Sequence, residues 1–295
     1  MHAFISHSSK NNDVAAKLEK QLEARGLEVW IDLSEIRLGV LLGLELQENI
    51  RASRAVLLLW SDAAAGSRWV TTEWIMAIHE EIFIVPCTLD ETALPQCLQN
   101  SVYLRVEQDV ASIADRLAGA VKRAPAAANP LAPVIRAEEP ALKEVIHAIN
   151  QGQMGMLDQL QKRHQNEAKR LQRQLDDLMA KAEKVWRFDS MIANLGGYHR
   201  KNAYMLTHWD AIQAGRAPKA RLLRAAERRF FDSLSVDPTD PSALNGIGNV
   251  FFFERDLDAA EAFHLWAIKC AEKRGTNYPA AQHDLRMVRH FKTGV

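Results

Sequence analysis

The sequence AVLLLW at 55–60 decides the fold of the first part of the chain. It is a nearly continuous hydrophobic run, which is typical of a central parallel strand that is buried on both faces. Outward from it, HAFIS at 2–6 and LEVWI at 27–31 precede it, and IFIVPC at 82–87 and SVYLRV at 101–106 follow it. Stretches with helical spacing of apolar residues separate these runs. The alternation predicts a flavodoxin-like α/β domain with a five-stranded parallel sheet.

Helices are expected at about 12–25, 41–53, 68–80 and 109–123. In a parallel sheet covered by helices on both faces, ligands bind in the crevice beyond the carboxyl ends of the strands. The loops after Ser6, Ile31 and Trp60 all open at that edge. The sequence therefore predicts a ligand site built from these three loops.

A proline-rich segment ends this domain. Residues 124–140, APAAANPLAPVIRAEEP, contain four of the ten prolines and no glycine, which predicts a semi-rigid, extended linker. The expected domains are 1–123 before this linker and 141–295 after it. Residues 1–123 carry 12 Lys and Arg against 17 Asp and Glu, and the remainder carries 25 against 20, so the two halves have opposite net charge.

The stretch 141–188 lacks proline and predicts a long helix with a heptad seam of barely three heptads. Its seam positions are Leu157, His164, Ala168, Leu171, Leu175, Leu178, Ala182 and Val185. A seam of this length is compatible with a short coiled coil. It is equally compatible with a single long helix that packs on its own C-terminal domain, and both interpretations stay open at this point.

Residues 189–295 show a degenerate sequence repeat with a period of 34 residues, which is typical of helical repeats. The small and aromatic residues that mark it are Ala226, Phe230, Ser233 and Pro238, then Leu244, Gly248, Phe251, Ala260 and Ala267, then Tyr278, Ala281 and Leu285. This pattern resembles a short, degenerate tetratricopeptide array. An all-α helical-repeat domain is therefore expected, and tetratricopeptide arrays bind proteins or peptides or serve as oligomerisation units.

Three segments resemble a known family. FISHSSKN at 4–11, VWIDLSEIRLG at 29–39 and SRWVTTEW at 67–74 occur in the order and spacing of a Toll/interleukin receptor (TIR) domain. The resemblance covers about 120 residues. Together with its helical half, the chain is similar to bacterial TIR proteins. It implies one of two functions, because some TIR domains cleave NAD whereas many are interaction modules only.

The resemblance implies that Glu73 is the catalytic residue of an NAD-cleaving domain. Cleavage of the nicotinamide N-glycosidic bond builds positive charge on the ribose, and one carboxylate can stabilise that charge. Trp69 lies one helical turn before Glu73, where its ring could stack on a planar base, or simply pack against the sheet. The remaining residues implied as substrate contacts are His7, Ser8, Ser9, Lys10, Asp32 and Arg37. Serine and asparagine before a helix also satisfy free amides, so helix capping is the plainer interpretation of the first loop.

The segment 32–39 resembles the loop through which TIR domains contact one another. The chain departs from the family pattern after it, where GVLLGLEL at 39–46 places apolar residues in a polar loop. An exposed apolar tip predicts a protein partner. The expected assembly loop consists of Ile36, Leu38, Gly39, Val40, Leu41 and Leu42. It is either a self-association surface or an autoinhibitory contact with the helical domain of the same chain.

The resemblance as a whole implies an assembly-activated NAD glycohydrolase in bacterial antiphage signalling, which releases ADP-ribose or a cyclic isomer. The alternative is a non-catalytic TIR scaffold. NAD is expected as substrate, with no cofactor and no metal, and a homo-oligomer is expected through both halves. A protein or nucleotide trigger is expected at the helical half, where Arg216, Lys219, Arg221, Arg224, Arg228 and Arg229 cluster. Nucleic acid is not expected as a partner, since such a cluster is more often a solvated helix face. The chain has no apolar window long enough to span a membrane, and a cytoplasmic protein is expected.

Overall fold

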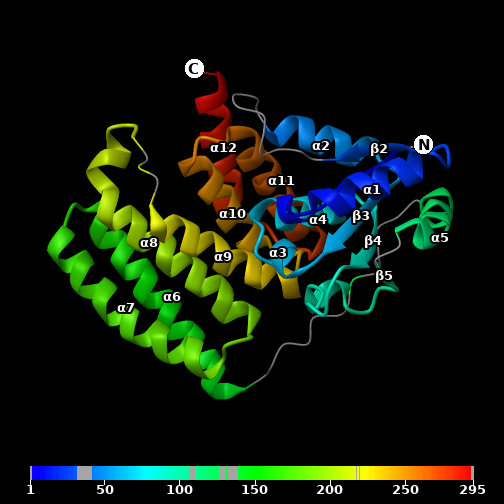
Figure 1. Cartoon of the computed structure of the whole chain (residues 1–295). Helices are drawn as coiled ribbons and strands as arrows, with labels where there is room; N and C mark the ends of the chain where they lie inside the picture. Colours follow the sequence, from blue (N-terminus) through cyan, green and yellow to red (C-terminus); the bar gives the residue numbers. More distant parts are fainter. Residues whose placement is uncertain are drawn as a thin grey trace. The chain divides into compact units, whose positions relative to one another are not determined.

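The structure, a computed structural model, describes residues 2–31, 42–106, 110–125, 131, 139–216, 218 and 220–293, with side chains left undescribed at 42–45 and 112. The chain forms two compact units, Met1–Pro133 and Val134–Val295. Figure 1 labels their helices and strands. Most of the predicted linker, 126–130 and 132–138, lies outside the described residues.

The first unit contains a five-stranded parallel sheet, as the sequence predicted. Its strands are β1 (His2–Ser6), β2 (Glu28–Ile31), β3 (Ala55–Trp60), β4 (Phe83–Thr88) and β5 (Leu104–Arg105). Their order is β2-β1-β3-β4-β5, and every neighbouring pair is parallel. The edge strand β5 is shorter than the predicted 101–106. Val102 and Tyr103 lie outside it and are 90% and 54% exposed, so no packing surface holds them in the sheet.

Helices cover both faces of this sheet. Helices α1 (Asn12–Glu23) and α5 (Val110–Lys122) pack on the face that carries Ile5 and Leu57. Helices α2 (Leu42–Ala52) and α4 (Arg68–His79) contact each other and β1. Between β3 and α4 lies a short helix, α3 (Asp62–Ala65), that the sequence did not predict. The Ser61 hydroxyl caps it by accepting a hydrogen bond from the amide of Ala64 at 3.1 Å.

The regular structure in the described residues of the second unit is all helical. Its helices are α6 (Pro140–Gln161), α7 (Gln165–Val185), α8 (Ser190–Gln213), α9 (Arg221–Val236), α10 (Pro241–Phe253), α11 (Leu257–Lys273) and α12 (Pro279–Thr293). Each of these helices packs against the next along the chain, and α10 also contacts α8 and α12. No helix in the described part of either unit is long and apolar enough to cross a membrane.

The stretch 141–188 is not one long helix, so the continuous helix that the heptad spacing predicted is wrong. Helix α6 ends at Gln161 and α7 begins at Gln165, with Arg163 between them in the left-handed region at φ 62°. The intervening residues are charged or exposed and have no apolar surface to bury. The two helices form a hairpin beside α8 (Figure 1). Seam residues Ala168 and Leu175 are buried against α6 and α8 of the same chain.

Phe230 of α9 fills a slot between two glycines of neighbouring helices. A Cβ atom at Gly197 of α8 would lie 2.5 Å from the Phe230 ring, and one at Gly246 of α10 would lie 2.4 Å from it. Real Cβ atoms do not approach so closely, so both positions need glycine to let the helices meet around the aromatic ring. Phe230 is one of the residues that mark the 34-residue sequence repeat.

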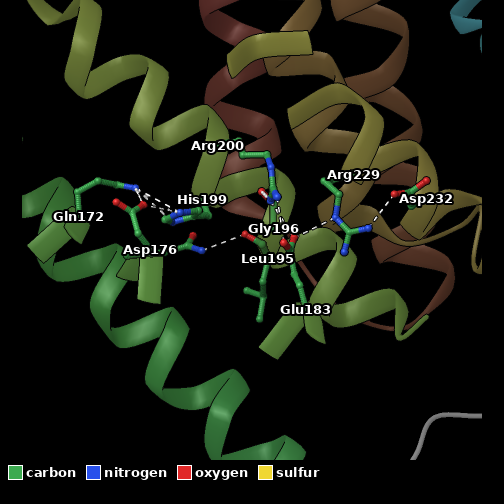
Figure 2. A network of polar contacts seen from close by, with 10 residues as sticks. Gln172, Asp176, Glu183, Leu195, Gly196, His199, Arg200, Arg229 and Asp232 are labelled. Atoms are coloured by element: carbon green, nitrogen blue, oxygen red, sulfur yellow. Dashed lines mark hydrogen bonds and ion pairs between the residues drawn. The ribbon is translucent and has the colours of Figure 1, made fainter. Parts of the chain in front are cut away.

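A network of ion pairs joins α7, α8 and α9 (Figure 2). The Glu183 carboxylate binds Arg200 at 2.8 Å and Arg229 at 3.1 Å, and Arg229 also binds Asp232 at 2.8 Å. Burial alone would raise the pKa of Glu183, but the hydrogen bond from Arg200 and the charges of Arg200, Arg229 and His199 hold it below its usual value. The network fixes the register of three helices at once.

Candidate functional site

Glu73 lies inside the first unit, bound to the end of β1. Its side chain is on α4, and the residue is only 1% exposed. The Ser6 hydroxyl donates a hydrogen bond to Glu73 Oε2 at 2.5 Å, and Ser6 is fully buried. Side chains alternate between the faces of a strand, so Ser6 shares with Phe4 the face of β1 that does not carry Ile5. The hydrogen bond between the Ser6 hydroxyl and the Glu73 carboxylate thus joins β1 to α4 at the carboxyl edge of the sheet.

The local sequence fixes where α4 begins and therefore where Glu73 points. Ser67 is the N-cap, and its hydroxyl accepts a hydrogen bond from the amide of Val70 at 3.4 Å. The hydroxyls of Thr71 and Thr72 bond back to the carbonyls of Ser67 and Arg68 at 2.9 and 3.0 Å. These bonds satisfy polar groups that the buried helix takes out of water.

The loop after β1 brings two of the predicted substrate contacts beside the Ser6–Glu73 pair. His7 and Ser8 directly follow Ser6 and are each 7% exposed. The ring of His7 bonds through Nε2 to Asn12 Oδ1 at 2.9 Å. Ser9 and Lys10, in contrast, are exposed on a 3-10 turn, so the loop separates into a buried part and a solvent-facing part.

A hydrogen bond links this first loop to the loop after β3. The Ser61 hydroxyl donates to Asn11 Oδ1 at 2.8 Å. The two loops that flank the central strands therefore converge at the carboxyl edge of the sheet, as expected for this topology. The third loop that the sequence assigned to the site lies outside the described residues. This applies to Asp32, Ile36, Arg37, Leu38, Gly39, Val40 and Leu41, and to the side chain of Leu42, whose backbone begins α2.

The two tryptophans of α4 have different environments. Trp69 is half-buried, and the guanidinium of Arg68 lies 5.4 Å from the centre of its ring. Trp74 is 1% exposed and belongs to the core. Trp69 therefore keeps an accessible surface one turn before Glu73, whereas Trp74 packs in the interior.

A hollow of about 420 Å³ opens at the carboxyl ends of β4 and β5. Its lining includes Thr88, Asp90, Tyr103 and Arg105, and Arg105 forms an ion pair with Glu91 across its rim. The sequence did not predict this hollow. Glu73 is not among its lining residues, so the hollow is separate from the Ser6–Glu73 pair.

The cysteines offer no nucleophile in this structure. All three are free and buried. Burial raises the pKa of Cys87 to about 12 and that of Cys270 to about 11, so both thiols stay protonated at neutral pH. In the part of the chain that the structure describes, no group of three His, Cys, Asp or Glu side chains could hold a metal ion.

The basic cluster of the second unit is partly neutralised. Arg224 pairs with Glu227 and Glu254 at 3.1 Å each. Arg229 belongs to the Glu183 network, and Lys219 lies outside the described residues. A nucleotide would have to compete with these internal carboxylates, so the cluster is a weak anchor for an anionic trigger.

Sequence reasoning missed Ser6 as the partner of Glu73, and Asn12 as the partner of His7. Ser6 did carry a signal, because it is the only polar residue of HAFIS after its first position and closes a strand that is otherwise apolar. A hydroxyl in a buried strand needs a hydrogen-bond partner. Its partner, however, is 67 residues away in the sequence, and only the fold brings the two together.

Comparison with known proteins gives a family match within the first unit. Residues 3–119 match the family model of the TIR domain, and the rest of the chain is predominantly helical. No curated protein and no solved structure that was compared with the chain matches it.

Proposed function

We propose, from the premise that residues 3–119 are a TIR domain, that the protein is an NAD glycohydrolase with Glu73 as its catalytic carboxylate. The observation that carries this proposal is the position of Glu73. Its carboxylate is withdrawn from water at the carboxyl edge of a parallel sheet, where such folds bind ligands. A carboxylate in a water-excluded site interacts with a developing cation far more strongly than one in bulk solvent.

The proposed reaction breaks the bond between C1′ of the ribose and N1 of nicotinamide. The electron pair of this bond leaves with nicotinamide, which departs from a pyridinium as a neutral molecule, so no general acid is needed. The oxocarbenium ion that remains is stabilised by the Glu73 carboxylate. Addition of water at C1′, with loss of a proton, gives ADP-ribose, and attack by an oxygen or the adenine of the same molecule gives a cyclic isomer.

Neighbouring residues have roles that follow from their positions. The buried His7 and Ser8 would contact the ribose beside Glu73, and the accessible ring of Trp69 would stack on a planar base. Ser9 and Lys10 face solvent, where a phosphate of the same ligand would reach them. Asp32 and Arg37 complete the proposed set from the loop that follows β2.

Control by assembly also belongs to the proposal. Glu73 is 1% exposed, so substrate cannot reach it without a rearrangement. Contact between TIR domains through residues 36–42 would supply that rearrangement, and a single chain would be inactive. An enzyme that depletes NAD only after assembly suits a role in antiphage signalling.

A second candidate function is a non-catalytic scaffold that acts through TIR and helical contacts. The same burial supports it, because a carboxylate that is hydrogen-bonded in the interior also serves to hold α4 on the sheet. The two functions differ in one respect. Only the enzyme requires Glu73 to meet a substrate.

The deciding experiment measures turnover of an etheno-NAD analogue by the full chain over a concentration series that drives assembly. Glu73→Gln should lower the rate by about 10² to 10³, which corresponds to roughly 3–4 kcal/mol of transition-state stabilisation. Glu23→Gln, at an exposed position of α1, is the matched control and should keep the wild-type rate. Equal turnover in wild type and Glu73→Gln, or none in wild type at any concentration, would favour the scaffold.

A further inference from the structure

The first turn of α4 carries a positive charge beside the ring of Trp69. The guanidinium of Arg68 lies over this ring, 5.4 Å from its centre. Arg68 is the first residue of α4, and no acidic residue stands in that turn. The amino end of a helix has a positive partial charge, so an arginine there is electrostatically unfavourable. The stability of α4 itself therefore does not explain a positive charge at this position.

Glu73 places a negative charge one turn beyond Trp69 on the same face of α4. Side chains four residues apart on a helix are neighbours, with their Cβ atoms about 5–6 Å apart. Trp69 and Glu73 have this spacing, and Trp69 is half-buried whereas Glu73 is 1% exposed. The electrostatic potential thus falls along α4 from Arg68, past the Trp69 ring, to Glu73.

The proposed substrate moves its own positive charge in the same direction during cleavage. In NAD the charge lies in the nicotinamide ring, and in the transition state it moves to C1′ and the ring oxygen of the ribose. With the nicotinamide ring stacked on Trp69 and the ribose at Glu73, this charge moves away from Arg68. The Arg68 guanidinium then repels the pyridinium of the bound substrate, and the Glu73 carboxylate attracts the cation that replaces it.

We propose that Arg68, acting through the Trp69 ring, destabilises the cationic nicotinamide ring of the bound substrate and thereby favours its release as neutral nicotinamide. The inference rests on the proposed function, because it needs NAD to be cleaved beside Glu73. The step is unchanged: the C1′–N1 bond breaks, and its electron pair goes to nicotinamide. Arg68 does not touch the reacting atoms, so it is a positioning residue. An interaction that weakens the substrate complex but not the transition state raises kcat and KM together.

The expected size of the effect follows from the distance between the two cations. The guanidinium is 5.4 Å from the centre of the Trp69 ring, and a ligand ring stacked on the opposite side adds the thickness of one contact, so the charges are roughly 9 Å apart. Near a protein surface, two unit charges at this separation change a binding constant by about tenfold. Without Arg68, the π-face of Trp69 would instead attract a cationic ring. The charge of Arg68 should therefore decide which kind of ring this tryptophan accepts.

The test compares ligands that carry different charges on this ring, with the full chain under conditions that drive assembly. Inhibition constants are measured for NADH, whose ring is neutral, and for a carbocyclic NAD analogue, whose ring is cationic and whose C1′–N1 bond is not cleaved. In Arg68→Met, the cationic analogue should bind about tenfold more tightly relative to NADH. The kcat and KM for NAD should both fall by about threefold or more. Arg68→Lys keeps the charge and should resemble the wild type, as should Arg116→Met at an exposed position of α5.

If the wild type cleaves NAD but Arg68→Met has the same preference between the two inhibitors, the role of Arg68 is overturned and the role of Glu73 is not. Equal weakening of both inhibitors would also overturn it, since Arg68 would then bind the phosphates that they share. Arg68→Gln is a second neutral variant, with the same expected results, for the case in which Arg68→Met fails to fold. Absence of turnover in the wild type at every concentration would reject the proposed function and this inference together.

Discussion

Two faces of α8 bury charge in opposite ways. On one face, Arg200 binds the Glu183 carboxylate, which Arg229 binds from the other side. Lys201, the next residue along the chain, is buried on another face, and among the described residues its ammonium has only the Met205 thioether sulfur within hydrogen-bond distance. On the first face the buried charges pair with one another, whereas on the second the Lys201 ammonium has no oxygen acceptor among the described residues.

This difference separates buried charges that stabilise the fold from a buried charge that destabilises it. A buried ion pair with all its hydrogen bonds made fixes one arrangement of helices, and removing one member leaves the other uncompensated. A buried charge without an oxygen acceptor costs stability, because desolvation of the charge is not compensated. Variants on the two faces of α8 should therefore change stability in opposite directions.

Lys201→Met should give the largest effect and should stabilise the protein. The lowering of the Lys201 pKa from 10.5 to about 8 corresponds to roughly 3 kcal/mol of destabilisation at neutral pH. Between these two values the unfolded chain binds the proton and the native chain does not, so wild-type stability rises with pH across that window. The advantage of Lys201→Met over wild type should therefore be greatest near pH 7 and should shrink as pH approaches 10.5. Urea unfolding at several pH values measures it, with Lys169→Met as the control, and a destabilised Lys201→Met at pH 7 would erase the contrast between the faces.

Glu183→Gln should destabilise the protein by about 2 kcal/mol, less than the 3–5 kcal/mol of a fully buried pair, because the three side chains remain 18–27% exposed. The native pKa of Glu183 is depressed, so its contribution is present above about pH 4.5 and is lost as pH falls through the native value. Glu167→Gln, in an exposed pair with Arg170 on the same helix, should leave the stability nearly unchanged, because solvent screens that pair. Unfolding at pH 7 and pH 4 compares the variants, and equal losses in both would show that the Glu183 network is not special.

Gly197→Ala tests the packing beside that network. The new methyl group would lie 2.5 Å from the buried Phe230 ring, and such overpacking costs about 1–2 kcal/mol. Gly155→Ala on α6 is the matched control, since its nearest neighbour, Leu171, would be 3.9 Å away. Alanine has the higher helix propensity, so the control should gain a few tenths to about 1 kcal/mol. Thermal unfolding of the two variants should therefore shift in opposite directions, and a shared direction would mean that Phe230 has room to move.

The sheet of the first unit could be predicted because each strand signals its own environment. AVLLLW is apolar at every position because both faces of β3 are covered, and a local run is enough to reveal this. The length of the edge strand β5 was overestimated, because SVYLRV has strand propensity but Val102 and Tyr103 stay largely exposed, at 90% and 54%.

The helical half shows where local pattern fails. The heptad spacing of Leu157, Leu171 and Leu178 does not distinguish one continuous helix from two helices in a hairpin. In both cases the residues at the packed positions are apolar. The turn at Arg163 contains no proline or glycine, so no local stop signal marks the end of α6. Lys201 was missed for a related reason. A lysine in a helix is ordinarily a solvated residue, and only the packing of α8 against its neighbouring helices removes this one from water.

The same question applies to Glu73, which is either a structural carboxylate like Glu183 or a catalytic one. Substitution of Ser6 has the smallest expected effect and is the most specific test. If the Glu73 carboxylate contacts a substrate, the Ser6 hydroxyl positions it for catalysis. Ser6→Ala should then lower kcat about tenfold, or about 1.4 kcal/mol, with little change in KM. Ser6→Thr keeps the hydroxyl and should recover most of the rate. If Glu73 belongs with Glu183, Ser6→Ala should instead lower the unfolding free energy and leave turnover per folded molecule unchanged. Initial rates with the etheno-NAD analogue, together with urea unfolding of the same three proteins, distinguish the two cases.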